Sequence, residues 1–139
     1  MDNISLENKF LKVRVKLFGA ELTSVFDKET HTEYMYQPDG IHWNKQSPIL
    51  FPNIGAIRNN SFSYKGNDYE ARKHGFARDY AFKLEDNGSD FATFLLTNEM
   101  IEENYPFDFQ LRLKYTLNGR QLDMSYFVTT QSPEMYFAI

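Results

Sequence analysis

The sequence of 139 residues has no cysteine, a single tryptophan and three histidines. Without cysteine, nothing in it argues for an oxidising compartment. No apolar run approaches the roughly 20 residues that a membrane span needs. The first residues, Met1 to Ser5, lack the basic and apolar regions of a signal peptide. We therefore expect a cytoplasmic protein that has no membrane as a partner.

An excess of basic charge is missing as well. The 15 Lys and Arg residues are interleaved with 19 Asp and Glu residues, for a net charge of -4. Without a basic stripe, nucleic acid is not an expected partner. Aromatic residues are plentiful at 17%, mostly Phe and Tyr, and they favour strands and stacking surfaces. Length and composition fit one globular domain, or part of one.

Hydrophobicity alternates with a period of two along most of the chain. Leu and Val alternate with Lys and Arg over residues 11–17, the pattern of a half-buried strand. Only residues 98–104 resemble a helical turn. This pattern predicts an all-β, antiparallel sandwich. The other strand-like stretches, each bounded by Gly, Pro, Asn or Asp, are 22–27, 32–36, 61–64, 69–71, 81–85 and 91–97.

Two dipeptides predict hairpins together with their registers. Asn118-Gly119 suits a two-residue turn with positive φ at both central residues, which would set Leu117 opposite Arg120. The pairs that follow on the same face are all apolar, as a correct register requires. Gly66-Asn67 predicts a second hairpin, with Tyr64 opposite Tyr69. The apolar pairs of the first hairpin are Tyr115 with Leu122, Leu113 with Met124, Leu111 with Tyr126 and Phe109 with Val128.

The strongest cluster of chemical groups is Lys-His-Gly-Phe-Ala-Arg-Asp at residues 73–79. A histidine titrates near neutrality and an arginine carries a permanent planar set of donors, so His74 and Arg78 together can bind a hydroxylated or anionic small molecule and exchange protons with it. A His-Gly-Phe turn followed by an Arg-Asp pair is also an ordinary way to close a loop. From these residues alone, both interpretations remain open.

The stretch from Gln37 to Asn60 is too long for a simple hairpin connection. It holds three prolines, two glycines and the tryptophan, and long ordered loops on a β scaffold often carry a site. Its proline-rich end, Pro48 to Gly55, is one of five motifs spread along the chain. The others are Gly19-Ala20-Glu21-Leu22, Phe62-Ser63-Tyr64 with Gly66 and Tyr69, His74 to Asp79, and Tyr105 to Phe109.

In this order, the five motifs resemble the aldose 1-epimerase (galactose mutarotase) family, and more narrowly its LacX-type subgroup. The resemblance extends over essentially the whole chain. It implies a galactose mutarotase-like β-sandwich, or supersandwich, with a sugar bound across the concave face of a large sheet. It also implies a monosaccharide partner of the galactose or glucose type.

The resemblance implies interconversion of the α and β anomers of free aldoses. A base removes the proton of the anomeric hydroxyl, an acid protonates the ring oxygen, and the ring opens, rotates and recloses. No cofactor is required, in agreement with the lack of metal-ligand spacing among the histidines. The match places His74 near the ring oxygen of the sugar, assisting catalysis. We expect Arg78 to position substrate or to brace His74.

Two departures from the family pattern limit what the chain can do. Ala56 stands where family members commonly have a sugar-gripping arginine; Arg58 could replace it if the segment is extended, or could simply be solvated. In the family, the general-acid histidine follows a strand like Met135 to Ile139, and the general-base glutamate comes much later. This chain contains neither residue.

We therefore interpret residues 1–139 as the N-terminal part of a single domain that is inactive alone. Two alternatives remain open. One is a sugar-binding protein without turnover. The other is a truncated remnant that self-associates through an open sheet edge.

Overall fold

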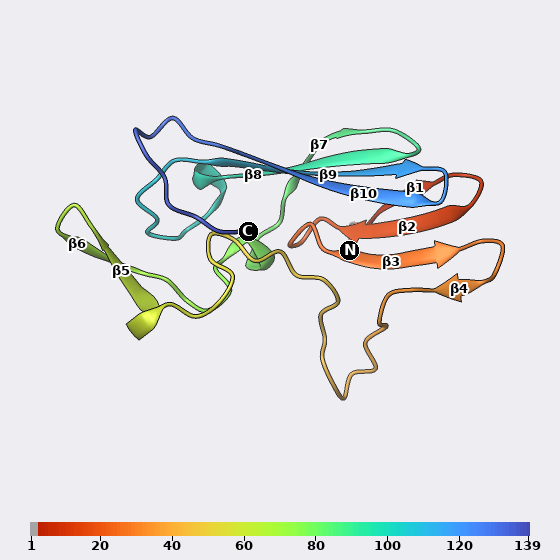
Figure 1. Cartoon of the computed structure of the whole chain (residues 1–139), viewed down its shortest axis with the longest axis horizontal. Helices are drawn as coiled ribbons and strands as arrows, with labels where there is room; N and C mark the ends of the chain where they lie inside the picture. The colour runs from red at the N-terminus through yellow and green to blue at the C-terminus, as the bar shows by residue number, and fades with distance from the viewer. Residues whose placement is uncertain (1–2) are drawn as a thin grey trace.

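The computed structural model describes residues 3–139, which form ten strands and three 3-10 helices, η1 (Arg58–Asn60), η2 (Ala77–Asp79) and η3 (Asn98–Met100). Two four-stranded antiparallel sheets lie one above the other, and a two-stranded hairpin lies to one side (Figure 1). The predicted all-β, antiparallel class is confirmed.

The first sheet has the order β1-β2-β3-β4, formed by β1 (Asn3–Glu7), β2 (Leu11–Lys16), β3 (Leu22–Asp27) and β4 (Thr32–Glu33). β1 was not predicted from the sequence, and β4 is shorter than the predicted stretch of residues 32–36. Glu33 explains the short β4, because its Oε1 accepts hydrogen bonds from the backbone N–H groups of Val25 at 2.8 Å and Met35 at 3.0 Å. The side chain thus takes over bonds that a longer ladder would make.

The second sheet has the order β10-β9-β8-β7, formed by β7 (Lys83–Asn87), β8 (Phe91–Thr97), β9 (Gln110–Asn118) and β10 (Gln121–Thr129). β7 starts two residues later than predicted because Ala81 instead makes an isolated bridge to Phe18. The sheets share one apolar core, to which both contribute alternate residues. Fully buried members include Leu6, Val13 and Val15 from the first sheet and Phe94, Leu96, Leu111 and Leu113 from the second.

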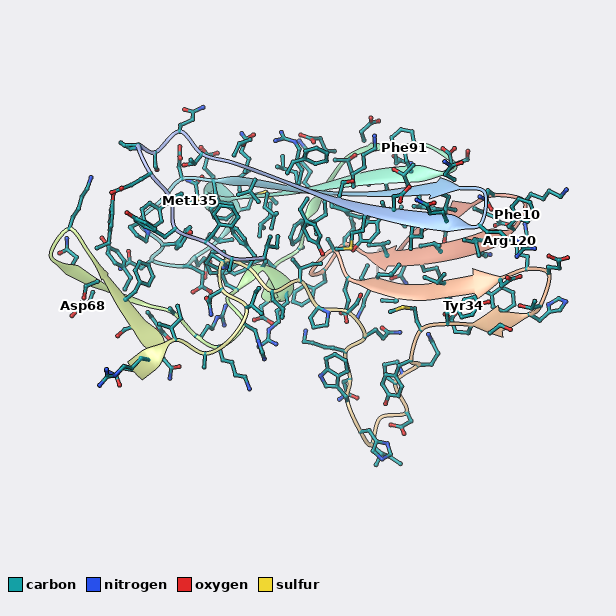
Figure 2. The ribbon with its side chains drawn as sticks, viewed as in Figure 1. Phe10, Tyr34, Asp68, Phe91, Arg120 and Met135 are labelled. Carbon is teal, nitrogen blue, oxygen red and sulfur yellow. The ribbon has the colours of Figure 1, made fainter. Side chains whose placement is uncertain are left out.

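Both hairpins form, but both predicted registers are wrong by two residues. In β9–β10, Leu117 pairs with Leu122, and the turn is Gly119-Arg120, with Gly119 at φ 59°. Contacts outside the hairpin favour this turn: Arg120 lies over the Phe10 ring at 4.7 Å, and its Nη1 is 2.9 Å from Asp27 Oδ2. Figure 2 shows Arg120 beside Phe10. A shift of two keeps every side chain on its predicted face.

The hairpin of β5 (Ser61–Tyr64) and β6 (Asn67–Glu70) pairs Phe62 with Tyr69. Its turn is Lys65-Gly66, and both residues have positive φ, at 49° and 80°. Both central residues therefore have the φ sign of a type I′ turn, one position earlier than predicted.

Residues 135–139 do not form the expected strand. Their backbone is irregular, and the Ala138 N–H donates to the Pro52 carbonyl at 2.8 Å. The Phe137 ring contacts Phe51 with ring centroids 5.9 Å apart. This C-terminal segment thus packs on the proline-rich loop instead of extending a sheet.

Candidate functional site

The proline-rich loop and the His-Gly-Phe turn are joined through the backbone of Phe51. Its carbonyl accepts hydrogen bonds from the N–H groups of Phe76 at 2.9 Å and Ala77 at 3.1 Å. Gly75, at φ 67°, packs so closely that an added Cβ would lie 2.1 Å from the same carbonyl oxygen. The turn therefore requires glycine at position 75 for both space and conformation.

His74 is half-buried, and its backbone is in the left-handed region, at φ 71°. Its Nδ1 lies 2.5 Å from the carbonyl oxygen of Ile54, and its backbone N–H donates to Gly55 at 3.3 Å. A carbonyl can only accept, so Nδ1 carries a proton and donates, and in the neutral form of the ring Nε2 is the hydrogen-bond acceptor. A non-glycine residue in the left-handed region is strained and persists only where the surrounding structure compensates the strain. Such residues are concentrated at functional sites.

Asn53 holds the loop and the turn in a fixed relation. Its Nδ2 donates to the carbonyl of Gly55 at 2.8 Å and to that of Arg72 at 3.0 Å. Because Ile54 and Gly55 in turn hold His74, the amide of Asn53 positions the imidazole indirectly. The sequence analysis included Asn53 only as part of a motif and assigned it no role.

Arg78 lies on η2, with its side chain 25% exposed. Its Nε is buried without a hydrogen-bond partner and lies 3.8 Å from the nearer carboxylate oxygen of Asp79. Within residues 3–139, no hydrogen bond joins Arg78 to His74. The bracing of His74 and the positioning of a ligand by Arg78 both stay predictions.

Arg58 does not follow the expected extended path. It begins η1 after Ile57, so the alternation that would carry its side chain to the face of Ala56 does not apply. The side chain of Arg58 is exposed. A sugar contact by Arg58 stays a prediction that the local backbone no longer supports.

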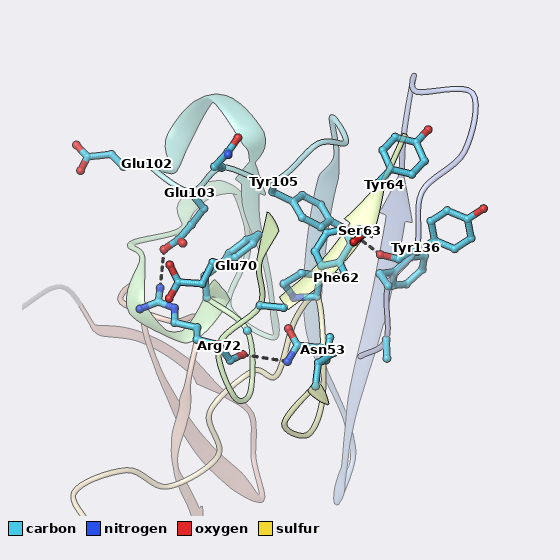
Figure 3. Close-up of a pocket in the computed structure, with 18 residues that line it drawn as sticks. Asn53, Phe62, Ser63, Tyr64, Glu70, Arg72, Glu102, Glu103, Tyr105 and Tyr136 are labelled. Carbon is cyan, nitrogen blue, oxygen red and sulfur yellow. Dashed lines mark hydrogen bonds and ion pairs between the residues drawn. The ribbon is translucent and has the colours of Figure 1, made fainter. Parts of the chain in front are cut away.

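A cavity of about 710 Å³ lies between the β5–β6 hairpin, residues 102–105 and the C-terminal segment, and Asn53 and Gly75 of the loop and turn also line it (Figure 3). Its lining includes neither His74 nor Arg78 nor Arg58. Two polar residues on its wall form an ion pair, with Arg72 Nη2 2.6 Å from Glu103 Oε1. Neither Arg72 nor its pairing with Glu103 was predicted from the sequence. The two residues are 31 positions apart, and only the folding of the chain brings them together.

Two hydroxyl groups border the same region. Tyr105 donates to the backbone carbonyl of Tyr136 at 2.9 Å, and Tyr80 donates to Glu103 at 3.1 Å. Burial raises the pKa of the Tyr105 hydroxyl. Burial also raises the pKa of Tyr80. The neighbouring Glu103 raises this pKa as well, whereas the hydrogen bond from the Glu102 N–H lowers it. Both hydroxyls therefore stay protonated and able to donate at neutral pH.

Within residues 3–139, no helix is long and apolar enough to cross a membrane. In the same range, no group of three or more His, Cys, Asp or Glu side chains is placed to hold a metal ion.

Comparison with known proteins identifies the family. The aldose 1-epimerase family model matches residues 2–139. The chain belongs to the aldose 1-epimerase family. It is 39% identical over 137 residues to the chromosomal LacX protein of Lactococcus lactis subsp. lactis, and 38% identical to the plasmid LacX protein of that organism. These matches cover 94% of this chain and 46% of either LacX protein.

Solved structures of the aldose 1-epimerase type have the same fold. A galactose mutarotase related enzyme from Lactobacillus acidophilus is 36% identical, with a TM-score of 0.90 over 96% of this chain and 45% of that one. A galactose mutarotase-like protein from Lactobacillus casei ATCC 334 is 32% identical, with a TM-score of 0.88. This match covers 97% of this chain and 46% of that one.

The chain thus spans about half the length of the curated relatives that it matches. The family resemblance and the galactose mutarotase-like fold expected from the motifs are confirmed. Membership of the family and similarity to LacX support a carbohydrate-related role.

Proposed function

We propose that this chain supplies one side of a monosaccharide site in a cytoplasmic aldose 1-epimerase-type protein. His74 contacts a galactose- or glucose-type sugar near its ring oxygen, and Arg78 donates to the sugar hydroxyls. The observation that carries this proposal is the bond from His74 Nδ1 to the Ile54 carbonyl, which orients the ring and leaves Nε2 for a ligand. The side chain of Arg78 is 25% exposed, and the exposed part of its guanidinium supplies further donors.

The proposed reaction is the exchange of α and β anomers through the open-chain aldose. The anomeric hydroxyl loses its proton to a base while an acid protonates the ring oxygen, and reclosure on the other face reverses both transfers. Neither the acid nor the base belongs to the motifs found here. We therefore propose that residues 1–139 are the N-terminal part of one domain and bind sugar without turning it over.

Polarimetry tests the catalytic part of the proposal. We expect the 139-residue chain to leave the rate at which glucose or galactose equilibrates between anomers at its buffer value. Clear acceleration by the chain, abolished in His74→Ala, would contradict the assignment of the acid and base to a missing part.

NMR titration with free galactose and glucose tests binding. Millimolar sugar should shift the resonances of His74 and Arg78. His74→Gln should weaken this response, because one amide group cannot donate to the Ile54 carbonyl and accept from the sugar in the geometry of the imidazole ring. Arg58→Ala separates the two arginines, since an intact response assigns the contact to Arg78 and a weakened response supports a contact by Arg58. Unmoved His74 and Arg78 resonances would contradict sugar binding at this turn.

A second candidate role is self-association through the free edge of β10. Within residues 3–139, β10 pairs only with β9, and it carries Tyr126 and Phe127 at 44% and 51% exposure. An apolar edge strand of this kind can pair with another copy. Sedimentation should then show a concentration-dependent dimer that Phe127→Lys abolishes, whereas a strict monomer contradicts this role.

A further inference from the structure

We propose that the cavity beside the β5–β6 hairpin is a second binding site, independent of His74, for a neutral saccharide ring. Its volume of about 710 Å³ lies within the range of small-molecule sites and far exceeds a packing defect. Nothing in the proposed role of His74 requires this space.

One wall of the cavity is aromatic and held rigidly. Tyr64 contacts Phe107 with ring centroids 4.7 Å apart, and the hydroxyl of Tyr64 donates to Glu134 at 2.9 Å. Tyr105 is fixed by its bond to the Tyr136 carbonyl, and Tyr136 itself is 63% exposed at the rim. Fixed aromatic faces suit the apolar C–H face of a sugar ring and lose little entropy on binding.

The opposite wall is polar and can bond to hydroxyl groups. Figure 3 shows Arg72, Glu70 and Glu103 on the side facing the aromatic rings. Arg72 is paired with Glu103 through Nη2, and its side chain is 42% exposed. The exposed guanidinium can donate to a ligand oxygen, and the exposed Glu70 carboxylate can accept from a hydroxyl. An apolar face opposite a hydroxyl-binding face is the arrangement that a saccharide ring requires.

The charge of the lining decides against an anionic ligand. Glu70, Glu102 and Glu103 line the cavity with a single basic residue, Arg72, which gives the lining a formal charge of -2. Arg72 is already engaged by Glu103, and its Nη1 lies 3.7 Å from Asp79 Oδ2. A phosphate or carboxylate would meet uncompensated negative charge, so a sugar phosphate should bind worse than a neutral sugar.

The test uses methyl β-glucopyranoside and methyl β-galactopyranoside, which are neutral and cannot exchange anomers. Titrated into the 139-residue chain at up to tens of millimolar, they should shift the ring resonances of Tyr64, Tyr105 and Tyr136 saturably. Glucose 6-phosphate should bind there about tenfold more weakly or worse. Unmoved rings, or equal binding of the phosphate, would overturn the proposal.

Variants separate this site from that at His74. Tyr136→Leu removes an exposed ring and Glu70→Gln removes one charge, and each should weaken methyl glycoside binding several-fold. Tyr34→Leu is the matched control, because Tyr34 is 62% exposed at the opposite end of the molecule (Figure 2). His74→Gln should leave the shifts of the cavity tyrosines unchanged. If His74→Gln abolishes these shifts and Tyr136→Leu does not, the glycoside binds at the turn and the cavity is no site.

Discussion

At the scale of single residues, the candidate site depends on the backbone of the His-Gly-Phe turn. His74 and Gly75 are both left-handed, at φ 71° and 67°. The Phe51 carbonyl fills the space where a side chain at position 75 would begin. His74 is held by two hydrogen bonds, one from Nδ1 to the carbonyl of Ile54 and one from its backbone N–H to the carbonyl of Gly55. Small changes in this turn should therefore alter the position of the imidazole.

Gly75→Ala should destabilise the fold strongly. The new Cβ would lie 2.1 Å from the Phe51 carbonyl oxygen, and alanine is strained at this φ. We expect a loss on the order of 3 kcal/mol in the free energy of unfolding, measured by urea denaturation. Gly55→Ala is the control, because no heavy atom lies within 4 Å of its added Cβ. Equal stability of the two variants would contradict the close packing at Gly75.

At the scale of elements, side chains that reach across the fold fix turns and registers. Arg120 ties the β9–β10 turn to β3 through Asp27 and to the β1–β2 turn through Phe10. Asp108 does the same for the segment after β10. Its Oδ1 accepts from the N–H groups of Gln131 at 2.8 Å and Ser132 at 2.9 Å, and from the Thr130 hydroxyl at 2.9 Å.

Arg120→Ala should lower the free energy of unfolding by about 1 kcal/mol. The substitution removes the cation–π contact with Phe10 and leaves the Asp27 carboxylate, which is 6% exposed, without its cationic partner. Arg58→Ala is the matched control, because Arg58 is exposed on η1. Chemical denaturation of both variants checks the difference, and similar losses would contradict the role of Arg120.

Asp108 predicts a specific dependence of stability on pH. The hydrogen bond from the Gln131 N–H lowers the pKa of Asp108 below its ordinary value of 3.8, and the hydrogen bonds from Thr130 and Ser132 lower it further. Burial acts in the opposite direction and raises the pKa, but by less than these bonds lower it. Because the folded pKa is lowered, the stabilisation is full above pH 3.8 and is lost as pH falls through the folded pKa. Asp108→Asn should therefore flatten the fall in the urea midpoint below about pH 4, and an unchanged fall in this variant would contradict the role of Asp108.

At the scale of the whole molecule, a buried hydrogen bond joins the two sheets. The hydroxyl of Tyr115, on β9, donates to the carbonyl of Ala20, between β2 and β3, at 2.8 Å. Both residues are fully buried. The bond therefore anchors the Gly19-Ala20 turn, where an added Cβ on Gly19 would lie 2.9 Å from the Arg78 carbonyl oxygen. The same turn thus contacts both the second sheet and η2.

Tyr115→Phe should cost about 1 kcal/mol, because it leaves the buried Ala20 carbonyl without a partner. Tyr126→Phe makes the same change on an exposed ring and should be nearly neutral. Among residues 3–139, the hydroxyl of Tyr126 forms a hydrogen bond only to the Met124 sulfur, at 3.5 Å. Urea denaturation compares the two. A neutral Tyr115→Phe would show that this bond adds no net stability.

Local pattern was enough to predict much of the fold. β3, β5 and β8 have the predicted bounds. Their signals, alternating apolar residues and flanking turn residues, both lie within a few positions of the strand itself. The motifs also predicted the family, and they predicted His74 and Arg78 as candidates whose roles the structure leaves to experiment. The length of β4 was not predictable in the same way, because it depends on where the Glu33 carboxylate finds its donors.

The sequence by itself determined which residues face the core and where hairpins form, since side-chain alternation and turn chemistry are local properties. Only the tertiary structure decided the registers, the tautomer of His74 and the cavity next to Arg72. Each of these depends on a contact between distant segments, such as Arg120 with Asp27, His74 with Ile54, or Arg72 with Glu103. A register slip of two preserves the apolar pattern, so pattern alone could not distinguish the alternatives.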